Sequence, residues 1–164
     1  WLMISLGTAL LLAAVISFFR NSVQSAVALA VLIPVVIVMG GNAATQTMTV
    51  VVRALQLNEI SWDNGFRVVA KEALAGLVNG AAVGLVAGIV AALWFRSPMF
   101  GVAMAVTLVL TIVVGGVVGT LIPLLLKRFR VDPAMASSVF VLTATVVVGL
   151  LVYLTLGTFV FVVK

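Results

Sequence analysis

The chain has 164 residues, of which 65% are hydrophobic and only 8% are charged, and its net charge is +5. A soluble domain is roughly 45–50% apolar and about 25% charged, so this composition excludes a water-soluble fold and indicates a protein embedded in the lipid bilayer. The chain has neither Cys nor His, which excludes disulfides, thiol nucleophiles and histidine-based acid–base chemistry, and its nine Lys and Arg flank apolar runs as in membrane proteins rather than forming a nucleic-acid-binding patch.

The apolar runs predict an all-α membrane protein with five transmembrane helices. The first run covers residues 1–19, which is long enough to cross about 30 Å of hydrocarbon. The second covers 23–57, contains Pro34, and has a polar middle that begins at Gly40-Gly41-Asn42. Two adjacent glycines inside a span favour a broken helix, so we expect the second helix to be interrupted at this Gly-Gly-Asn motif.

The second half of the chain predicts three further spans. Residues 58–71 are the only extended polar stretch, and Trp62, Phe66 and Val69 in it predict a short helix in the membrane interface. Three apolar runs follow, and we expect the third, fourth and fifth spans over residues 72–95, 99–126 and 133–163. Asp132 is expected to cap the fifth helix, with Pro133 at its first position.

The basic residues predict the orientation of the chain in the cell membrane. An N-terminus in the cytoplasm places six of them on the inner side and three on the outer side: Arg53, Arg67, Lys71, Lys127, Arg128 and Arg130 against Arg20, Arg96 and Lys164. This excess predicts a multi-pass protein whose N-terminus is cytoplasmic and whose C-terminus lies outside.

Glycines recur every four residues on the third span, at Gly76, Gly80, Gly84 and Gly88. Small residues at this spacing let two membrane helices approach closely. We interpret them as a packing surface, with a sliding or gating surface as the alternative.

Polar side chains at membrane depth are costly, so they indicate where function resides. Asn42, Thr45, Gln46 and Thr49 fall on nearly one helical face. Amides, hydroxyls and unwound backbone carbonyls suit the passage of a hydrated cation. The alternative is that these groups form hydrogen bonds between helices and only hold the bundle together.

Two weaker sets of candidates complete the site. Thr143 and Thr145 place hydroxyls on the fifth span, although Thr in a membrane helix usually bonds its own backbone. Glu72 and Asp132 are candidates for a divalent-cation site at the inner rim, because hard cations prefer carboxylate oxygens. Glu72 is alternatively expected to pair with Lys71 or Arg67, and Asp132 to act only as a cap.

The polar stretch of the second span resembles the signature of the MgtE-type magnesium channel family: it reads Gly40-Gly41-Asn42-Ala43-Ala44-Thr45-Gln46, followed by Val51-Val52-Arg53-Ala54-Leu55. Residues 71–80, 122–128 and 131–134 agree with the same family in order and spacing, so the resemblance covers essentially the whole chain. It implies a homodimer of five-helix subunits that passes Mg²⁺ down its gradient. It also implies a pore at the dimer axis, lined by the second and fifth helices, and one transmembrane domain over residues 1–164 without the family's cytosolic regulatory domains.

The chain departs from this family at the pore. The family's fifth helix carries an acidic residue in a Thr-x-Thr-Asp-like run, whereas the corresponding run here is Thr143-Ala144-Thr145-Val146. Val146 therefore occupies the position of the pore acid, where it would form a dry collar that resists ions. Oxygens of Asn42, Gln46 and the threonines would then have to replace the missing carboxylate.

We therefore expect a pathway for divalent cations, most simply Mg²⁺, with the bilayer and a second copy of the chain as partners and no bound cofactor or nucleic acid. The alternative function is a membrane module that does not conduct, or has altered selectivity, and serves dimerisation or scaffolding. An enzyme is not expected, because no base is evident that would activate Ser137 or Ser138.

Overall fold

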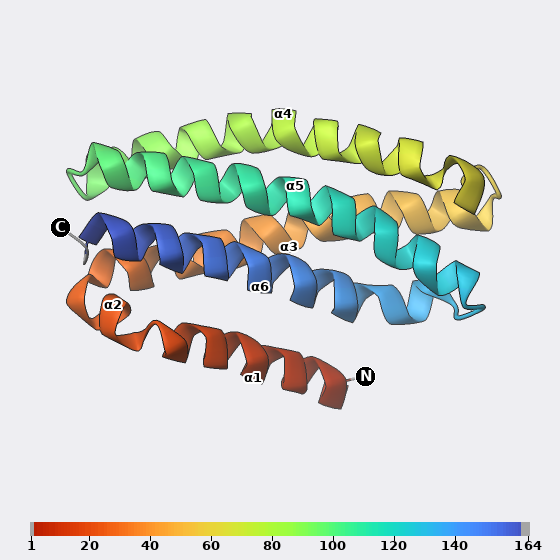
Figure 1. The fold of residues 1–164 in the computed structure, drawn as a ribbon, viewed down its shortest axis with the longest axis horizontal. Coiled ribbons are helices and arrows are strands. Elements are labelled where there is room, and N and C mark those ends of the chain that lie inside the picture. The colour runs from red at the N-terminus through yellow and green to blue at the C-terminus, as the bar shows by residue number, and fades with distance from the viewer. Residues whose placement is uncertain (1, 162–164) are drawn as a thin grey trace.

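The computed structural model describes residues 2–161, apart from the side chains of residues 134–137, and the described residues form helices joined by short turns, without β-strands. The chain forms six helices: α1 Leu2–Phe18, α2 Arg20–Ser25, α3 Val27–Gln56, α4 Trp62–Trp94, α5 Pro98–Arg128 and α6 Pro133–Phe161. The four long helices run side by side, with the α3–α4 and α5–α6 turns at one end and α2 and the α4–α5 turn at the other (Figure 1).

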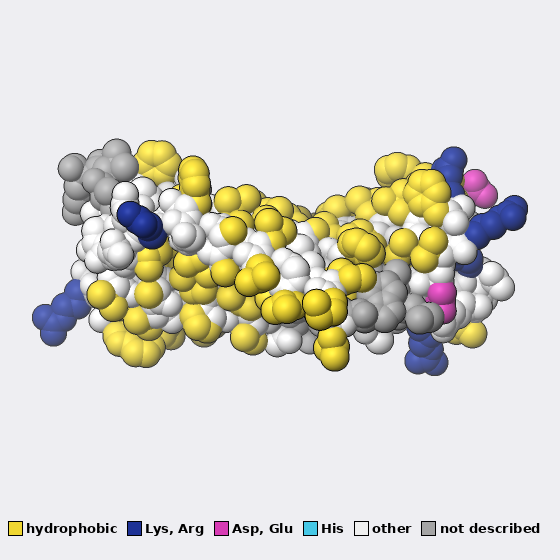
Figure 2. Space-filling view, turned by 90° about the horizontal axis from the view of Figure 1, so that it is seen from below, with side chains coloured by type: hydrophobic (Ala, Val, Ile, Leu, Met, Phe, Trp, Pro, Cys, Tyr) yellow, Lys and Arg dark blue, Asp and Glu magenta, His cyan; other side chains and the backbone are white. Residues whose placement is uncertain are grey.

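Among the described residues, four helical segments are long and apolar enough to cross a membrane: α3, α4, α5 and residues 138–161 of α6. The first helix, α1, is apolar but has only 17 residues, which is the lower limit for a span. Lys and Arg side chains gather at the two ends of the molecule, with an apolar band between them (Figure 2). The prediction of a helical membrane protein is confirmed: the described residues contain four long apolar helices and the shorter apolar helix α1. Residue 1 and residues 162–164, including Lys164, lie outside the described part.

The predicted break at the Gly-Gly-Asn motif is wrong, because α3 is continuous from Val27 to Gln56. The glycines meet a close neighbour instead of unwinding the helix: a Cβ added to Gly40 would lie 2.6 Å from Thr111 Cγ2 of α5. The interruption in this region lies earlier, at Ala26, whose extended backbone (φ −140°, ψ 95°) separates α2 from α3.

The predicted interfacial helix over residues 58–71 is not a separate element. Asn58 turns the chain with a positive φ of 57°, and α4 then begins at Trp62 and continues without interruption through the third span. The Ser61 amide donates to Asn64 Oδ1 (2.8 Å), which satisfies an otherwise free group at the start of the helix. Trp62 and Phe66 do stack edge-to-face on its first turns, with 6.4 Å between ring centroids.

The central helix of the bundle is α5, which packs against α3, α4 and α6. Its contact with α4 is a seam of small residues, because Gly76, Gly80, Gly84 and Gly88 are all buried against it. A Cβ on Gly84 would lie 2.7 Å from the Ala105 carbonyl oxygen. The interpretation of these glycines as a packing surface is therefore confirmed.

The apolar core lies between α3, α5 and α6 and is built largely from Leu, Val, Met and aromatic side chains. Tyr153 of α6 is buried in it and donates its hydroxyl to the Leu29 carbonyl of α3 (3.0 Å). The first helix, α1, lies at the margin: it contacts mainly α6, has no buried residue and diverges from the bundle (Figure 1).

Candidate functional site

A polar pocket lies between α3 and α4. Both helices pack on α5 rather than on each other, and the space left between them forms an open pocket of about 440 Å³. Its floor includes Ile112 and Gly116 of α5. Its walls carry the polar side chains of Asn42, Gln46, Thr47, Glu72 and Asn79.

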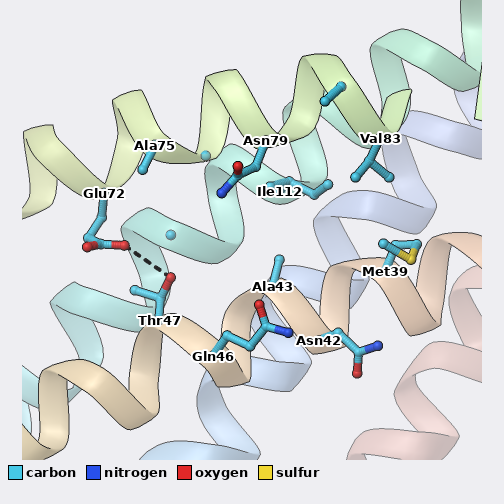
Figure 3. A pocket seen from close by; sticks show the side chains of 13 residues that line it. Met39, Asn42, Ala43, Gln46, Thr47, Glu72, Ala75, Asn79, Val83 and Ile112 are labelled. Atoms are coloured by element: carbon cyan, nitrogen blue, oxygen red, sulfur yellow. Dashed lines mark hydrogen bonds between the residues drawn. The ribbon is translucent and has the colours of Figure 1, made fainter. Parts of the chain in front are cut away.

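Glu72 and Thr47 face each other at one end of this pocket (Figure 3). The Thr47 hydroxyl of α3 donates to Glu72 Oε2 of α4 over 3.2 Å, and both residues are half-buried. Further along, the amide of Asn79 points from α4 toward α3, and the amide of Gln46 rises from α3 into the same space (Figure 3). The pocket therefore combines one carboxylate, one hydroxyl and several neutral amides, which is a set of oxygen donors suited to a hard cation.

Two glycines of α5 position the Glu72–Thr47 pair. A Cβ on Gly116 would lie 2.8 Å from the backbone oxygen of Glu72, and a Cβ on Gly119 would lie 3.1 Å from Thr47 Cβ. The absence of side chains at these two positions brings the backbones of α3 and α4 down onto α5 on either side. This close approach sets the separation between the carboxylate and the hydroxyl.

Of the residues that the sequence predicts on the second span, Asn42 and Gln46 are exposed and line the pocket. The hydroxyl of Thr45 instead donates to the Gly41 carbonyl of its own helix (2.9 Å), and Thr49 donates in the same way to Thr45 (2.7 Å). The expected polar face therefore separates into amides that face the pocket and hydroxyls that bond the helix backbone.

The threonines of the fifth span do not reach the pocket. Thr143 donates to the Val139 carbonyl within α6 (2.6 Å). Thr145 is fully buried where Gly40 and Gly115 leave room for its methyl group, and its hydroxyl has no hydrogen-bond partner. An unpartnered buried hydroxyl costs about 1–3 kcal/mol, so Thr145 is a strained point of the packing between α3, α5 and α6.

Val146 is packed inside the helix bundle, where only 4% of its surface is exposed. Leu142 and Tyr153 lie one and two turns away on the same face of α6, and both contact α3: Leu142 lies beside Gly41, and Tyr153 bonds the Leu29 carbonyl. Val146 therefore lies on the side of α6 that faces α3, in apolar packing within the chain.

The acidic candidates are not brought together. Glu72 lies in the pocket with Thr47 as its hydrogen-bond partner rather than the expected Lys71 or Arg67. Asp132 is exposed in the turn that leads into α6, which begins at Pro133 as predicted. Within the described residues no group of three or more acidic side chains is placed to hold a metal ion. The side chain of Ser137, considered above as a nucleophile, lies outside the described part.

Sequence reasoning missed Asn79 and the role of Thr47. The signal for Asn79 was its spacing, because it follows Glu72 by seven residues and so shares a face of α4 with it. This helix was interpreted from its glycine repeat, and the face that carries Glu72 and Asn79 was not considered. Thr47 lies inside the polar stretch of α3, and only the tertiary structure shows that it meets a carboxylate.

Comparison with known proteins gives a consistent result. The profile of the MgtE family, described as "Divalent cation transporter", matches residues 33–156. The chain is 33% identical to the magnesium transporter MgtE of Bacillus subtilis (strain 168) over 158 residues, which is 96% of this chain and 35% of that protein. It is 34% identical over 158 residues to the magnesium transporter MgtE of Thermus thermophilus, again 96% of this chain and 35% of the relative.

A third relative, the magnesium transporter MgtE of Enterococcus faecalis, is 33% identical over 153 residues, or 93% of this chain and 34% of its own length. The chain thus spans about a third of the length of these relatives, all of which are named as transporters rather than enzymes. The family match includes the polar stretch of α3, the pocket face of α4 and most of α6. The chain belongs to the MgtE family of divalent cation transporters.

Proposed function

We propose that the chain forms a membrane pathway for divalent cations and that Mg²⁺ is the transported ion. The observation that carries this proposal is the polar, open pocket between α3 and α4, set in helices that are otherwise apolar. Membership of the family and the names of its relatives support the choice of ion.

The exposed amides of α3 support a hydrated pathway. Asn42 and Gln46 lie in the middle of a 30-residue helix and are exposed in the single subunit. An unsatisfied polar group in hydrocarbon costs several kcal/mol, so this surface must meet water or another protein surface. Mg²⁺ keeps several of its waters when bound, and amide oxygens can hydrogen-bond those waters without removing them.

We further propose that two copies of the chain pair in the membrane and that α3 and α6 line the pore at their axis. Asn42 and Gln46 are the main lining residues in this arrangement. Thr45, Thr143 and Thr145 are secondary ones, because their hydroxyls bond their own helices or are buried. Val146 is buried on the side of α6 that faces α3, so the single subunit gives it no direct exposure to this pore.

The proposed orientation follows from the ends of the bundle. The α3–α4 and α5–α6 turns lie at the same end of the bundle (Figure 1). Six of the basic residues lie in or near these turns in the sequence. We propose that this end faces the cytoplasm, with the N-terminus on the same side and the C-terminus outside. Glu72 and Asp132 then lie near the inner rim of the pathway.

The test is Mg²⁺ uptake by liposomes that contain the purified chain and a trapped Mg²⁺-sensitive dye. We expect uptake down an imposed Mg²⁺ gradient at a rate above that of protein-free liposomes. Uptake that is absent in the chain and appears only in Val146→Asp would contradict conduction by this sequence, while showing that its scaffold supports conduction.

A non-conducting membrane module is the second candidate function, and one observation favours it. The position of the family's pore acid holds a valine that is 4% exposed, so the subunit offers no charge there to attract a cation. Absence of uptake in both the chain and Val146→Asp, with both proteins folded and dimeric, would establish this candidate. Uptake by the unaltered chain would exclude it.

A further inference from the structure

Glu72 is a carboxylate that enters the membrane region without a basic partner. It lies ten residues beyond Trp62 at the start of α4, about 15 Å along the helix axis. No Lys or Arg lines its pocket, and its hydrogen-bond partner there is the neutral hydroxyl of Thr47. A half-buried carboxylate without a counter-charge favours the binding of a cation.

We propose that the pocket between α3 and α4 binds one hydrated divalent cation within each subunit, with the Glu72 carboxylate as the anionic group that accepts hydrogen bonds from its waters. The amides of Asn79 and Gln46 hold the waters of the ion from the two walls of the pocket. This inference deepens the proposed function and rests on it for the identity of the ion. The proposed cation site differs in location from the pore site that the family resemblance implies. It lies between α3 and α4 of one subunit, whereas the family's pore acid lies on the helix that corresponds to α6.

The size of the pocket agrees with a hydrated ion rather than a bare one. Six waters at about 30 Å³ each, together with Mg²⁺, need about 200 Å³. The pocket volume is about 440 Å³, so the ion fits with its water shell and with room for further water. A bare Mg²⁺ would require near-octahedral oxygens at about 2 Å, which one carboxylate and distant amides do not supply.

The Glu72–Thr47 hydrogen bond prepares the carboxylate for this role. Thr47 donates to Oε2 only, so Oε1 and the remaining lone pairs stay available to the waters of the ion. Gly116 holds the Glu72 backbone against α5, which restricts the carboxylate to this end of the pocket. The negative charge at the pocket therefore comes from α4.

The test uses Mn²⁺ as the probe and the full chain in lipid nanodiscs, with free Mn²⁺ measured by electron paramagnetic resonance. We expect saturable binding of one Mn²⁺ per chain, displaced by Mg²⁺ but not by Na⁺. Glu72→Gln keeps the shape of the side chain and removes its charge, and we expect it to weaken binding by about tenfold or more.

Two further variants complete the test. Glu59→Gln is the matched control, because Glu59 is exposed in the turn before α4 and lies outside the pocket, and it should bind Mn²⁺ as the unaltered chain does. Ala75→Leu extends a small lining residue into the pocket and should also weaken binding, although it removes no charge. Equal Mn²⁺ affinity in the unaltered chain, Glu72→Gln and Ala75→Leu would overturn the proposed site.

Parallel flux measurements separate this inference from the proposed function. Mg²⁺ uptake that persists unchanged in Glu72→Gln, with unchanged Mn²⁺ binding, would overturn the site and leave the pathway intact. Mn²⁺ binding that is lost in Glu72→Gln, in a chain that shows no Mg²⁺ uptake, would support the site and contradict the pathway.

Discussion

The two sides of α4 differ in how they meet their neighbours. Toward α5, glycines at every fourth residue bring the two backbones into contact and leave no space between them. Toward α3, the same helix presents Glu72 and Asn79 among mostly small residues, and an open pocket remains. One helix therefore combines a closely packed glycine seam with a polar cavity.

The difference follows from how helices associate in lipid. Apolar burial contributes little there, since lipid is as apolar as the helix surface, so close packing of small residues has to stabilise the contact. The seam with α5 supplies that packing and holds α4 in place. The opposite face is then free to carry polar groups that would disrupt a tight contact.

Disrupting the glycine seam between α4 and α5 should give the largest loss of stability. Gly84→Leu places a branched side chain where even a Cβ would lie 2.7 Å from the Ala105 carbonyl oxygen, so α4 and α5 must separate. We expect the free energy of unfolding to fall by about 3 kcal/mol. Reversible unfolding in mixed SDS micelles, followed by circular dichroism, measures this change. Ala81→Leu, at an exposed position on the same helix, should change it by less than about 0.5 kcal/mol.

A smaller substitution at Gly116, which lies between the glycine seam and the pocket, should affect both stability and Mn²⁺ binding. In Gly116→Ala, the added Cβ would lie 2.8 Å from the Glu72 backbone oxygen, so α4 must shift away from α5 at the carboxylate. We expect a loss of about 1–2 kcal/mol in unfolding free energy, together with weaker Mn²⁺ binding.

The matched control for this change is Gly7→Ala in α1, where nothing lies within 4 Å of the added Cβ. The same substitution there should stabilise the chain by about 0.5–1 kcal/mol, because alanine is the better helix former. Equal effects at positions 7 and 116 would contradict the role given to Gly116.

The smallest expected changes in the free energy of unfolding come from substitutions of two threonines, and the two changes differ in sign. Thr47→Val removes the hydrogen bond to Glu72 and should cost about 1 kcal/mol. Thr145→Val replaces a buried hydroxyl without a partner and should leave stability unchanged or raise it by about 1 kcal/mol. The same unfolding measurement compares both. A large loss of Mg²⁺ uptake in Thr145→Val would instead show that this hydroxyl contacts the pathway.

The sequence was sufficient to predict the helical membrane fold, because the apolar runs have membrane length and Pro133 marks a helix start. The regular spacing of the glycines also predicted the close contact that they form. The Gly-Gly-Asn break was predicted wrongly because adjacent glycines favour either unwinding or close contact. Only the neighbouring helix, with Thr111 against Gly40, decides between them.

The site was predicted less completely. Helical periodicity identified Asn42 and Gln46, because their amides repeat on one face of α3. Periodicity did not distinguish these amides from Thr45, whose hydroxyl donates to its own helix backbone. The spacing of residues in a sequence does not determine side-chain rotamers. The pairing of Glu72 with Thr47 depends on two separate helices that meet across α5, which no local pattern predicts.

The position of α1 has a consequence for how the protein is made. Of the six helices, α1 leaves the ribosome first, yet its main neighbour is α6, which leaves last. During the synthesis of the four intervening elements, the main neighbour of α1 among the described helices is not yet present. A helix that is apolar on every side and buries no residue tolerates this interval, because lipid can solvate its whole circumference until α6 is inserted.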